Sequence, residues 1–129
     1  MKNQTLPEVG SHFIKPETAL EMIRLYRKNK ENILAPEFKE KNLLCFSETF
    51  NGLDVESLIT QAGCRGLRIY YGMKDDLQVH AILVGVDANG NSIFYRNANV
   101  MELIPLDLIM EDGQRCPPAC NDDDEQFNS

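Results

Sequence analysis

The segment 66–96 constrains the fold most, because its apolar residues follow the period of β-strands. Its first part alternates apolar with polar or aromatic side chains, which predicts a strand buried on one face (Leu67, Ile69 and Tyr71 against Arg68 and Tyr70). Residues 79–86 are nearly all apolar, as expected of a central strand covered on both faces. Asn89-Gly90 follows and is a strong hairpin signal, so residues 92–96 should form the return strand. The sequence therefore predicts an antiparallel β-meander.

Three helices are expected before this meander. Pro16 suits the first turn of a helix over 16–30, whose apolar residues form one stripe predicted to be buried (Ala19, Met22, Ile23 and Tyr26). Pro36 should begin a shorter helix ending near Leu44, and residues 45–51 have no clear pattern. Asp54 is the expected cap of a third helix that ends at Gly63 in the left-handed conformation. The predicted fold class is α+β, with N-terminal helices packed on a small antiparallel β-meander.

The later residues carry mixed signals. Over 97–110 the pattern favours a helical turn near 100–104 and a strand over 106–110. With 129 residues, the chain has room for one ordinary domain, which we expect over 11–112. Residues 1–10 should be a flexible N-terminus, and 113–129 an extended tail rich in cysteine, proline and acidic residues.

Composition and charge exclude several classes of function. The longest aliphatic run, 81–84, is far shorter than the roughly 18 residues of a membrane span, and the N-terminus lacks a hydrophobic signal segment. We therefore expect a cytoplasmic protein that does not bind membranes. The net charge is −7, and a chain this acidic is a poor binder of nucleic acid. The acidic tail and a locally basic stretch over 24–41 leave open whether the tail docks on the basic helix face.

The most unusual motif is Cys116-Pro117-Pro118-Ala119-Cys120. A residue before proline is pushed out of the α region, so the path should be extended and span about 12 Å at ~3.1 Å per residue. A disulfide needs Cα atoms closer than roughly 7 Å, so the expected state is a rigid tail with two reduced thiols. The pair closes only if Ala119 turns the chain back or if a cis bond precedes one of the prolines.

Two alternatives for Cys116 and Cys120 stay open: a redox or structural disulfide, and a metal site. Zn²⁺ usually takes four ligands and this motif supplies two, and the roles of Cys45 and Cys64 are not indicated. Bonded sulfur atoms, or sulfur atoms that share an ion, would favour a thiol protein over the reduced tail.

A second candidate set is a possible ligand-binding face on the predicted meander. Arg68, Tyr70 and His80 lie on adjacent predicted strands, and in a cleft they could bind an anion or move a proton. The plainer interpretation is a solvent-facing Arg/Tyr pair and a structural histidine. Burial of His80 in the core would remove the catalytic alternative.

Three segments together resemble a family of small bacterial proteins for which no activity is known. They are Arg68-Ile69-Tyr70-Tyr71-Gly72, the stretch 82–91 and the terminal CPPxC motif, so that the resemblance covers roughly residues 66–120. It implies that the meander and the CPPxC tail belong together, and it implies no activity, cofactor or partner.

The sequence thus favours a small, non-enzymatic binding or interaction module without a cofactor, a monomer or weak homodimer. Its partner would be a protein or a small ligand. The alternative is a thiol redox or metal-binding protein that acts through Cys116 and Cys120.

Overall fold

The structure is a computed structural model that describes residues 5–99, 102–105 and 108–123. Helices and antiparallel strands are both present, so the predicted α+β class is confirmed. The chain divides into two units, and each combines segments that are distant in sequence. The first unit consists of Met1–Pro7, Thr49–Gly72 and His80–Gly113, and the second of Glu8–Glu48, Met73–Val79 and Gln114–Ser129. None of the described helices is long and apolar enough to cross a membrane.

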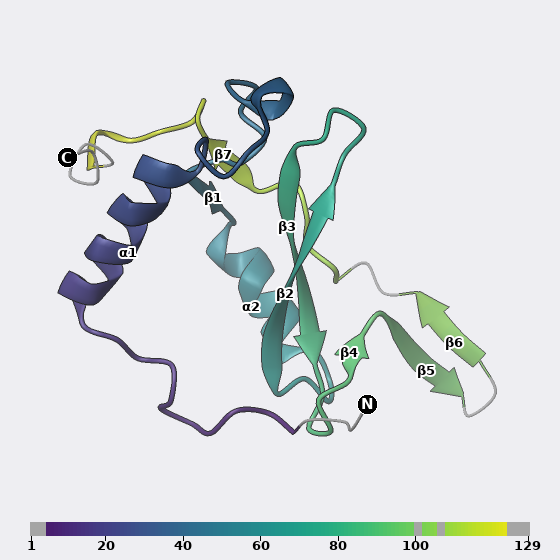
Figure 1. The fold of residues 1–129 in the computed structure, drawn as a ribbon. Helices are drawn as coiled ribbons and strands as arrows, with labels where there is room; N and C mark the ends of the chain where they lie inside the picture. The colour runs from purple at the N-terminus through teal and green to yellow at the C-terminus, as the bar shows by residue number, and fades with distance from the viewer. Residues whose placement is uncertain (1–4, 100–101, 106–107, 124–129) are drawn as a thin grey trace. The chain divides into compact units, whose positions relative to one another are not determined.

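Apart from Met73 and Val79, which belong to the second unit, the first unit contains a three-stranded sheet in the order β2 (Gly66–Met73), β3 (Val79–Val86) and β4 (Ser92–Ile93) (Figure 1). The predicted central strand over 79–86 is confirmed. The hairpin is also confirmed, because β3 and β4 pair antiparallel, and Gly90 takes φ +83° in the turn between them. The Asp87 carboxylate accepts the N–H groups of Asn89 and Asn91, each at 2.9 Å. The local turn chemistry therefore fixes this hairpin.

The return strand is shorter than predicted and is followed by a second hairpin. β5 (Tyr95–Asn99) pairs with β6 (Glu102–Pro105) in an antiparallel two-stranded sheet, with a register shift between Asn97 and Asn99. The helical turn expected near 100–104 is therefore wrong over 102–104, while Val100 lies outside the described residues. Of the strand expected over 106–110, residues 106–107 lie outside the described range, and Met110 forms an isolated antiparallel bridge with Leu83.

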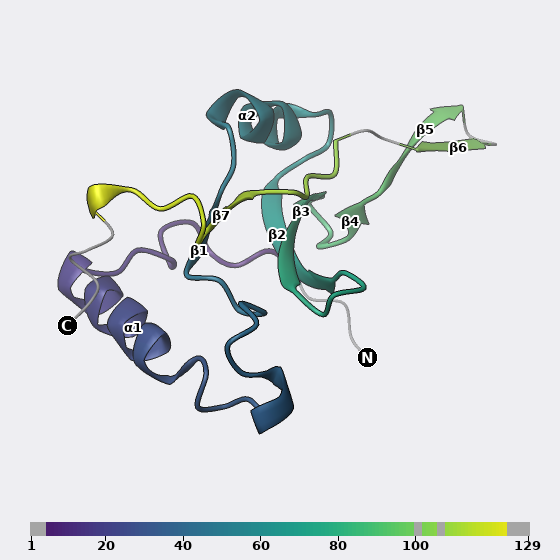
Figure 2. The same ribbon diagram turned by 90° about the horizontal axis from the view of Figure 1, so that it is seen from above.

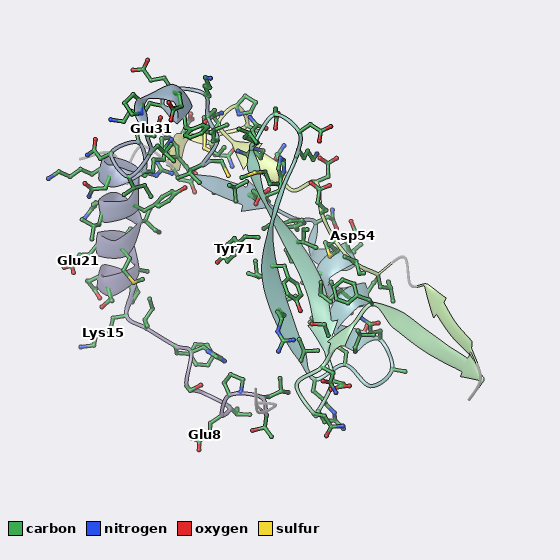
Figure 3. The ribbon with its side chains drawn as sticks, turned by 45° about the vertical axis from the view of Figure 1, so that its right-hand side comes forward. Glu8, Lys15, Glu21, Glu31, Asp54 and Tyr71 are labelled. Atoms are coloured by element: carbon green, nitrogen blue, oxygen red, sulfur yellow. A yellow bond between two sulfur atoms is a disulfide. The ribbon has the colours of Figure 1, made fainter. Side chains whose placement is uncertain are left out.

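The predicted facing of β2 is wrong. Leu67, Ile69 and Tyr71 were expected to be buried, but they are 44%, 50% and 82% exposed. Figure 3 shows the Tyr71 side chain projecting away from the strand. Arg68 on the opposite face is partly buried, because its guanidinium is held by the β3–β4 turn. Alternation defines two faces of a strand, and here hydrogen bonding to the turn decides which face is covered.

α2 (Gly52–Thr60) starts three residues earlier than predicted, because Asn51 rather than Asp54 is its cap. The Asn51 side chain accepts the Leu53 N–H at 2.9 Å. Gly63 has the predicted positive φ, +81°, but in a turn beyond the helix end. Figure 2 shows α2 beside the β2–β3 sheet. Among the described residues, the buried apolar side chains of this unit come from α2 and β3 (Leu58, Leu83, Val84 and Val86).

The second unit contains α1 (Pro16–Asn29), the 3-10 turn η1 (Pro36–Phe38), and, apart from Thr49, the paired strands β1 (Ser47–Thr49) and β7 (Gln114–Cys116). α1 confirms the first predicted helix, but it has no buried residue, and Met22 in its stripe is 62% exposed. The predicted burial of that stripe is wrong.

The second predicted helix, Pro36 to Leu44, is reduced to η1. Glu40 and Asn42 take φ of 59° and 58°, which a continuing helix does not allow. The Glu31 carboxylate, which follows α1 (Figure 3), accepts the Glu40 N–H at 2.6 Å and so stabilises the irregular loop. Residues 45–51, for which no pattern was evident, include the short strand β1.

Candidate functional site

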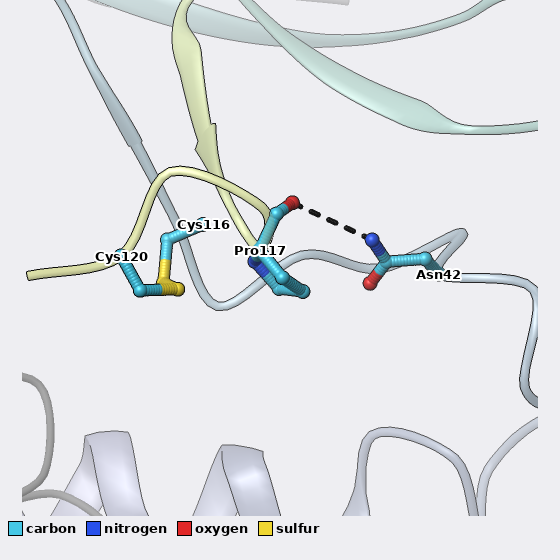
Figure 4. Close-up of a disulfide and its surroundings, with 4 residues drawn as sticks. All are labelled: Asn42, Cys116, Pro117 and Cys120. Carbon is cyan, nitrogen blue, oxygen red and sulfur yellow. Dashed lines mark hydrogen bonds between the residues drawn. A yellow bond between two sulfur atoms is a disulfide. The ribbon is translucent and has the colours of Figure 1, made fainter.

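The two cysteines of the C-terminal motif are joined in a disulfide bond (Figure 4). The Cα atoms of Cys116 and Cys120 lie 4.7 Å apart, inside the limit of roughly 7 Å for a bridge. The expectation of an extended tail with separated, reduced thiols is therefore wrong. The Cys116-Pro117 and Pro117-Pro118 bonds are both cis, which is one of the two routes to closure that the sequence allowed.

The bridged loop folds back on itself after β7. The Ala119 N–H donates to the Arg115 carbonyl at 2.9 Å, and the Cys120 N–H donates to the Pro118 carbonyl at 3.0 Å. Cys116 is 1% exposed, whereas Cys120 is exposed. A reductant therefore reaches this disulfide from the side of Cys120.

The loop over 42–46 is hydrogen bonded to the bridged segment. The Phe46 N–H donates to the Cys116 carbonyl at 2.7 Å, next to the β1–β7 pairing. The Asn42 side-chain amide donates to the Pro117 carbonyl at 3.4 Å (Figure 4). The two residues at the start of the disulfide loop thus each accept a hydrogen bond from the 42–46 loop.

The Arg115 side chain, on β7, donates hydrogen bonds to three backbone carbonyls. Its guanidinium donates to the carbonyls of Val79, Asn42 and Leu43, the last two at 3.0 and 3.4 Å. The Glu48 carboxylate lies 4.0 Å away, and both side chains are only 10% exposed. A planar guanidinium with five N–H donors is suited to such a role, which a lysine ammonium would fill less completely.

A cavity of about 310 Å³ lies in the same unit and is lined only by apolar residues (Leu34, Phe38, Leu43, Leu44, Met73, Leu77 and Val79). Leu43 is 6% exposed, whereas Met73 and Leu77 are 62% and 41% exposed. The cavity thus has a buried wall at Leu43 and is open to solvent near the β2–β3 connection.

Arg115 connects the disulfide loop to the walls of this cavity. Leu43 and Val79 both line it, and the carbonyls of both residues accept a hydrogen bond from Arg115. The Val79 N–H also donates to the Leu43 carbonyl at 2.9 Å. The separation of these two wall residues is therefore set by one backbone hydrogen bond and by the side chain of Arg115, the residue next to Cys116.

Two basic residues of the stretch 24–41 contact other residues of the second unit. The Arg27 guanidinium carbon lies 4.1 Å from the centre of the Phe46 ring, and the Lys30 ammonium lies 5.1 Å from it. Lys30 also pairs with Glu31 at 2.9 Å and is 8% exposed. These cations support the 42–46 loop. The sequence left open whether the acidic tail docks on this face, and residues 124–129 of that tail lie outside the described part of the chain.

Tyr26 and Cys45 meet on the side of the 42–46 loop that faces α1. The Tyr26 hydroxyl donates to the Cys45 carbonyl at 2.8 Å. Burial raises the pKa of the Tyr26 phenol, and the neighbouring Cys45 raises it further. Burial likewise raises the pKa of the Cys45 thiol. Cys45 therefore remains a protonated thiol at neutral pH and is a poor nucleophile for thiol exchange.

The structure brings together two residues of the predicted ligand-binding face. Arg68 donates to the Ser92 hydroxyl at 2.8 Å and to the Gly90 carbonyl at 3.0 Å. The Tyr70 and Ser92 hydroxyl oxygens lie 2.7 Å apart, and the Tyr70 ring lies 6.0 Å from that of Phe94. The arginine and tyrosine thus brace the β3–β4 turn.

His80 has a different polar neighbour. It is 5% exposed on β3, and its Nδ1 lies 3.3 Å from the Glu111 carboxylate. Its burial and its carboxylate neighbour favour the plainer interpretation of His80 as a structural histidine.

In the described parts of the chain, no group of three or more His, Cys, Asp or Glu side chains is placed to hold a metal ion. The Cys116 and Cys120 sulfur atoms are bonded to each other, and the Cys64 thiol donates to the Gly66 carbonyl at 3.2 Å.

Sequence reasoning missed the cavity and Arg115. The cavity walls come from three segments that are distant in sequence (34–44, 73–77 and 79), and each segment alone shows no functional pattern. The single available signal for Arg115 was that it is the only base from Asp107 to the end of the chain.

Comparison with family models, with curated proteins and with solved structures finds no match for this chain.

Proposed function

We propose that this protein is a non-enzymatic binding module whose cavity takes up a small apolar ligand. The observation that carries the proposal is the cavity of about 310 Å³ with seven apolar residues on its walls. Binding sites for small molecules are concave, mostly apolar and roughly 300–1,000 Å³ in volume. This cavity is at the lower end of that range.

The volume favours a ligand of one or two rings, or a short hydrocarbon chain. An apolar protein cavity of about 150 Å³ holds benzene, so about twice that volume suits a naphthalene-sized group. A ligand of about ten non-hydrogen atoms with a dissociation constant of about 1 µM needs about 0.8 kcal/mol per atom, below the ceiling of ~1.5. Affinity in the micromolar range is therefore physically accessible.

The chemistry of the walls favours a neutral ligand. Every residue that lines the cavity is Leu, Phe, Met or Val, so a charged group placed among them would lose hydration without gaining a side-chain partner. Anionic and cationic analogues should bind more weakly than a neutral hydrocarbon of the same shape.

The experiment is a titration with N-phenyl-1-naphthylamine, a neutral probe whose fluorescence rises in apolar surroundings. Its naphthyl group suits the cavity volume, and its phenyl ring can extend through the solvent-exposed side near Met73 and Leu77. Met73→Glu places a carboxylate on the cavity wall and should weaken probe binding by about tenfold. Met22→Glu is the matched control, because Met22 is also 62% exposed and does not line the cavity. Equal affinities in the two variants, or no saturable binding to the wild type, would contradict the proposal.

Thiol–disulfide exchange is the second candidate function, and the bonded sulfur atoms with Cys120 exposed favour it. The oxidised protein should show two free thiols in denaturant, Cys45 and Cys64, and four after reduction. The Cys116–Cys120 bridge should then equilibrate with a glutathione buffer within the physiological range of potentials. If the bridge stays oxidised throughout that range, the disulfide has a structural role alone, and thiol–disulfide exchange is contradicted.

A further inference from the structure

We propose that the Cys116–Cys120 disulfide is a reducible latch on the apolar cavity, so that reduction weakens ligand binding. This inference rests on the proposed function and concerns the regulation of the same cavity.

The first step is the attachment of the cavity wall to the disulfide loop. Phe46 donates its N–H to the Cys116 carbonyl at 2.7 Å, and Asn42 donates its side-chain amide to the Pro117 carbonyl at 3.4 Å. The residues between these two anchors include Leu43 and Leu44, which line the cavity. The wall segment is therefore held at both ends by the start of the bridged loop.

The second step is the position of Arg115, immediately before the bridge. It holds the Leu43 and Val79 carbonyls, which belong to two walls of the cavity, and its own carbonyl accepts the Ala119 N–H of the bridged loop at 2.9 Å. As long as the bridged loop stays closed, the Arg115 guanidinium stays within hydrogen-bond distance of the Leu43 and Val79 carbonyls. When the bridge opens, residues 117–120 gain conformational freedom, and the contacts of Arg115 and Cys116 weaken with them.

The third step is chemical access. A dithiol attacks the sulfur of Cys120, the exposed member, and forms a mixed disulfide while the Cys116 sulfur leaves as a thiolate and takes up a proton. The second thiol of the reductant then displaces the Cys120 sulfur and closes its own disulfide. Two electrons and two protons have then passed from the dithiol to the protein, and both cysteines are thiols.

The test measures N-phenyl-1-naphthylamine binding to the full chain with and without dithiothreitol. The oxidised protein should bind the probe, and the reduced protein should bind it about fivefold or more weakly. The Cys116→Ser/Cys120→Ser variant should have the weakened affinity in both conditions. Cys45→Ser/Cys64→Ser keeps the bridge and should respond to dithiothreitol as the wild type does.

Hydrogen exchange separates a local latch from general unfolding. Reduction should accelerate exchange of the Phe46 and Val79 amides and leave the Leu83 and Met110 amides, which bond to each other's carbonyls in the first unit, unchanged. Faster exchange of all four amides would overturn the latch. Equal probe affinity in the two redox states would also overturn the latch but would leave the proposed function intact. Absence of probe binding to the oxidised protein would overturn both. If the double-serine variant does not fold, reoxidation of the reduced wild type should restore affinity, and failure to restore it would count against the latch.

Discussion

Replacing Arg115 with methionine should destabilise the second unit substantially. The guanidinium donates to three backbone carbonyls, and both it and Glu48 are only 10% exposed. A hydrogen bond to a charged group contributes about 1.5–3 kcal/mol, and removal of one partner of a buried ion pair costs about 3–5 kcal/mol. Because these effects share atoms, they do not add, and we expect the free energy of unfolding to fall by about 3–5 kcal/mol. Methionine keeps much of the aliphatic volume, so the loss should come from the polar contacts.

The assay is urea unfolding followed by far-UV circular dichroism, combined with hydrogen exchange at the Val79 amide. Arg115→Lys should fall between the wild type and the methionine variant, because the donors of an ammonium share one nitrogen, whereas Arg115 uses two separate nitrogens for the Val79 carbonyl and for the Asn42 and Leu43 carbonyls. Arg65→Met is the control, since Arg65 is exposed. A loss below about 0.5 kcal/mol for Arg115→Met, as for an ordinary surface change, would refute the role of this arginine.

Three further predictions concern pH and packing. Burial raises the pKa of Tyr26, so the unfolded chain loses the phenol proton at a lower pH than the folded chain does. The free energy of unfolding should therefore fall as the pH rises above about 10. Unfolding titrations of Tyr26→Phe should show a smaller loss of stability at alkaline pH. The Glu40 N–H and then Lys30 lower the pKa of Glu31, so its stabilising effect should disappear as the pH falls below about 4.5. Unfolding titrations of Glu31→Gln should show a flatter acid dependence. Gly85→Ala would place a Cβ 2.7 Å from the Gln61 side-chain nitrogen and should cost about 1–3 kcal/mol in thermal or urea unfolding.

Much of the sheet could be predicted because its signals are local. The apolar run over 79–86 and the Asn-Gly turn specify β3 and its hairpin within a few residues, and Pro16 marks the start of α1. The facing of β2 could not be predicted in the same way. Its alternation is clear, but Arg68 is covered through hydrogen bonds to Gly90 and Ser92, which come from a later part of the chain.

The candidate site was largely beyond sequence reasoning. The CPPxC motif was recognisable, but the state of its cysteines depends on the isomers of two X-Pro bonds, which these few residues do not specify. The cavity is formed when Leu43, Met73 and Val79 come together from different segments. The apolar periodicity of one segment cannot indicate a cavity whose walls come from several segments.

The most direct measurement is a set of nuclear Overhauser effects between bound N-phenyl-1-naphthylamine and protein methyl groups. We expect contacts to the methyl groups of Leu43, Leu44 and Val79, which line the cavity. Contacts confined to the exposed methyl groups of Leu67 and Ile69 on β2 would contradict it, because the probe would then bind an open sheet face and not the cavity.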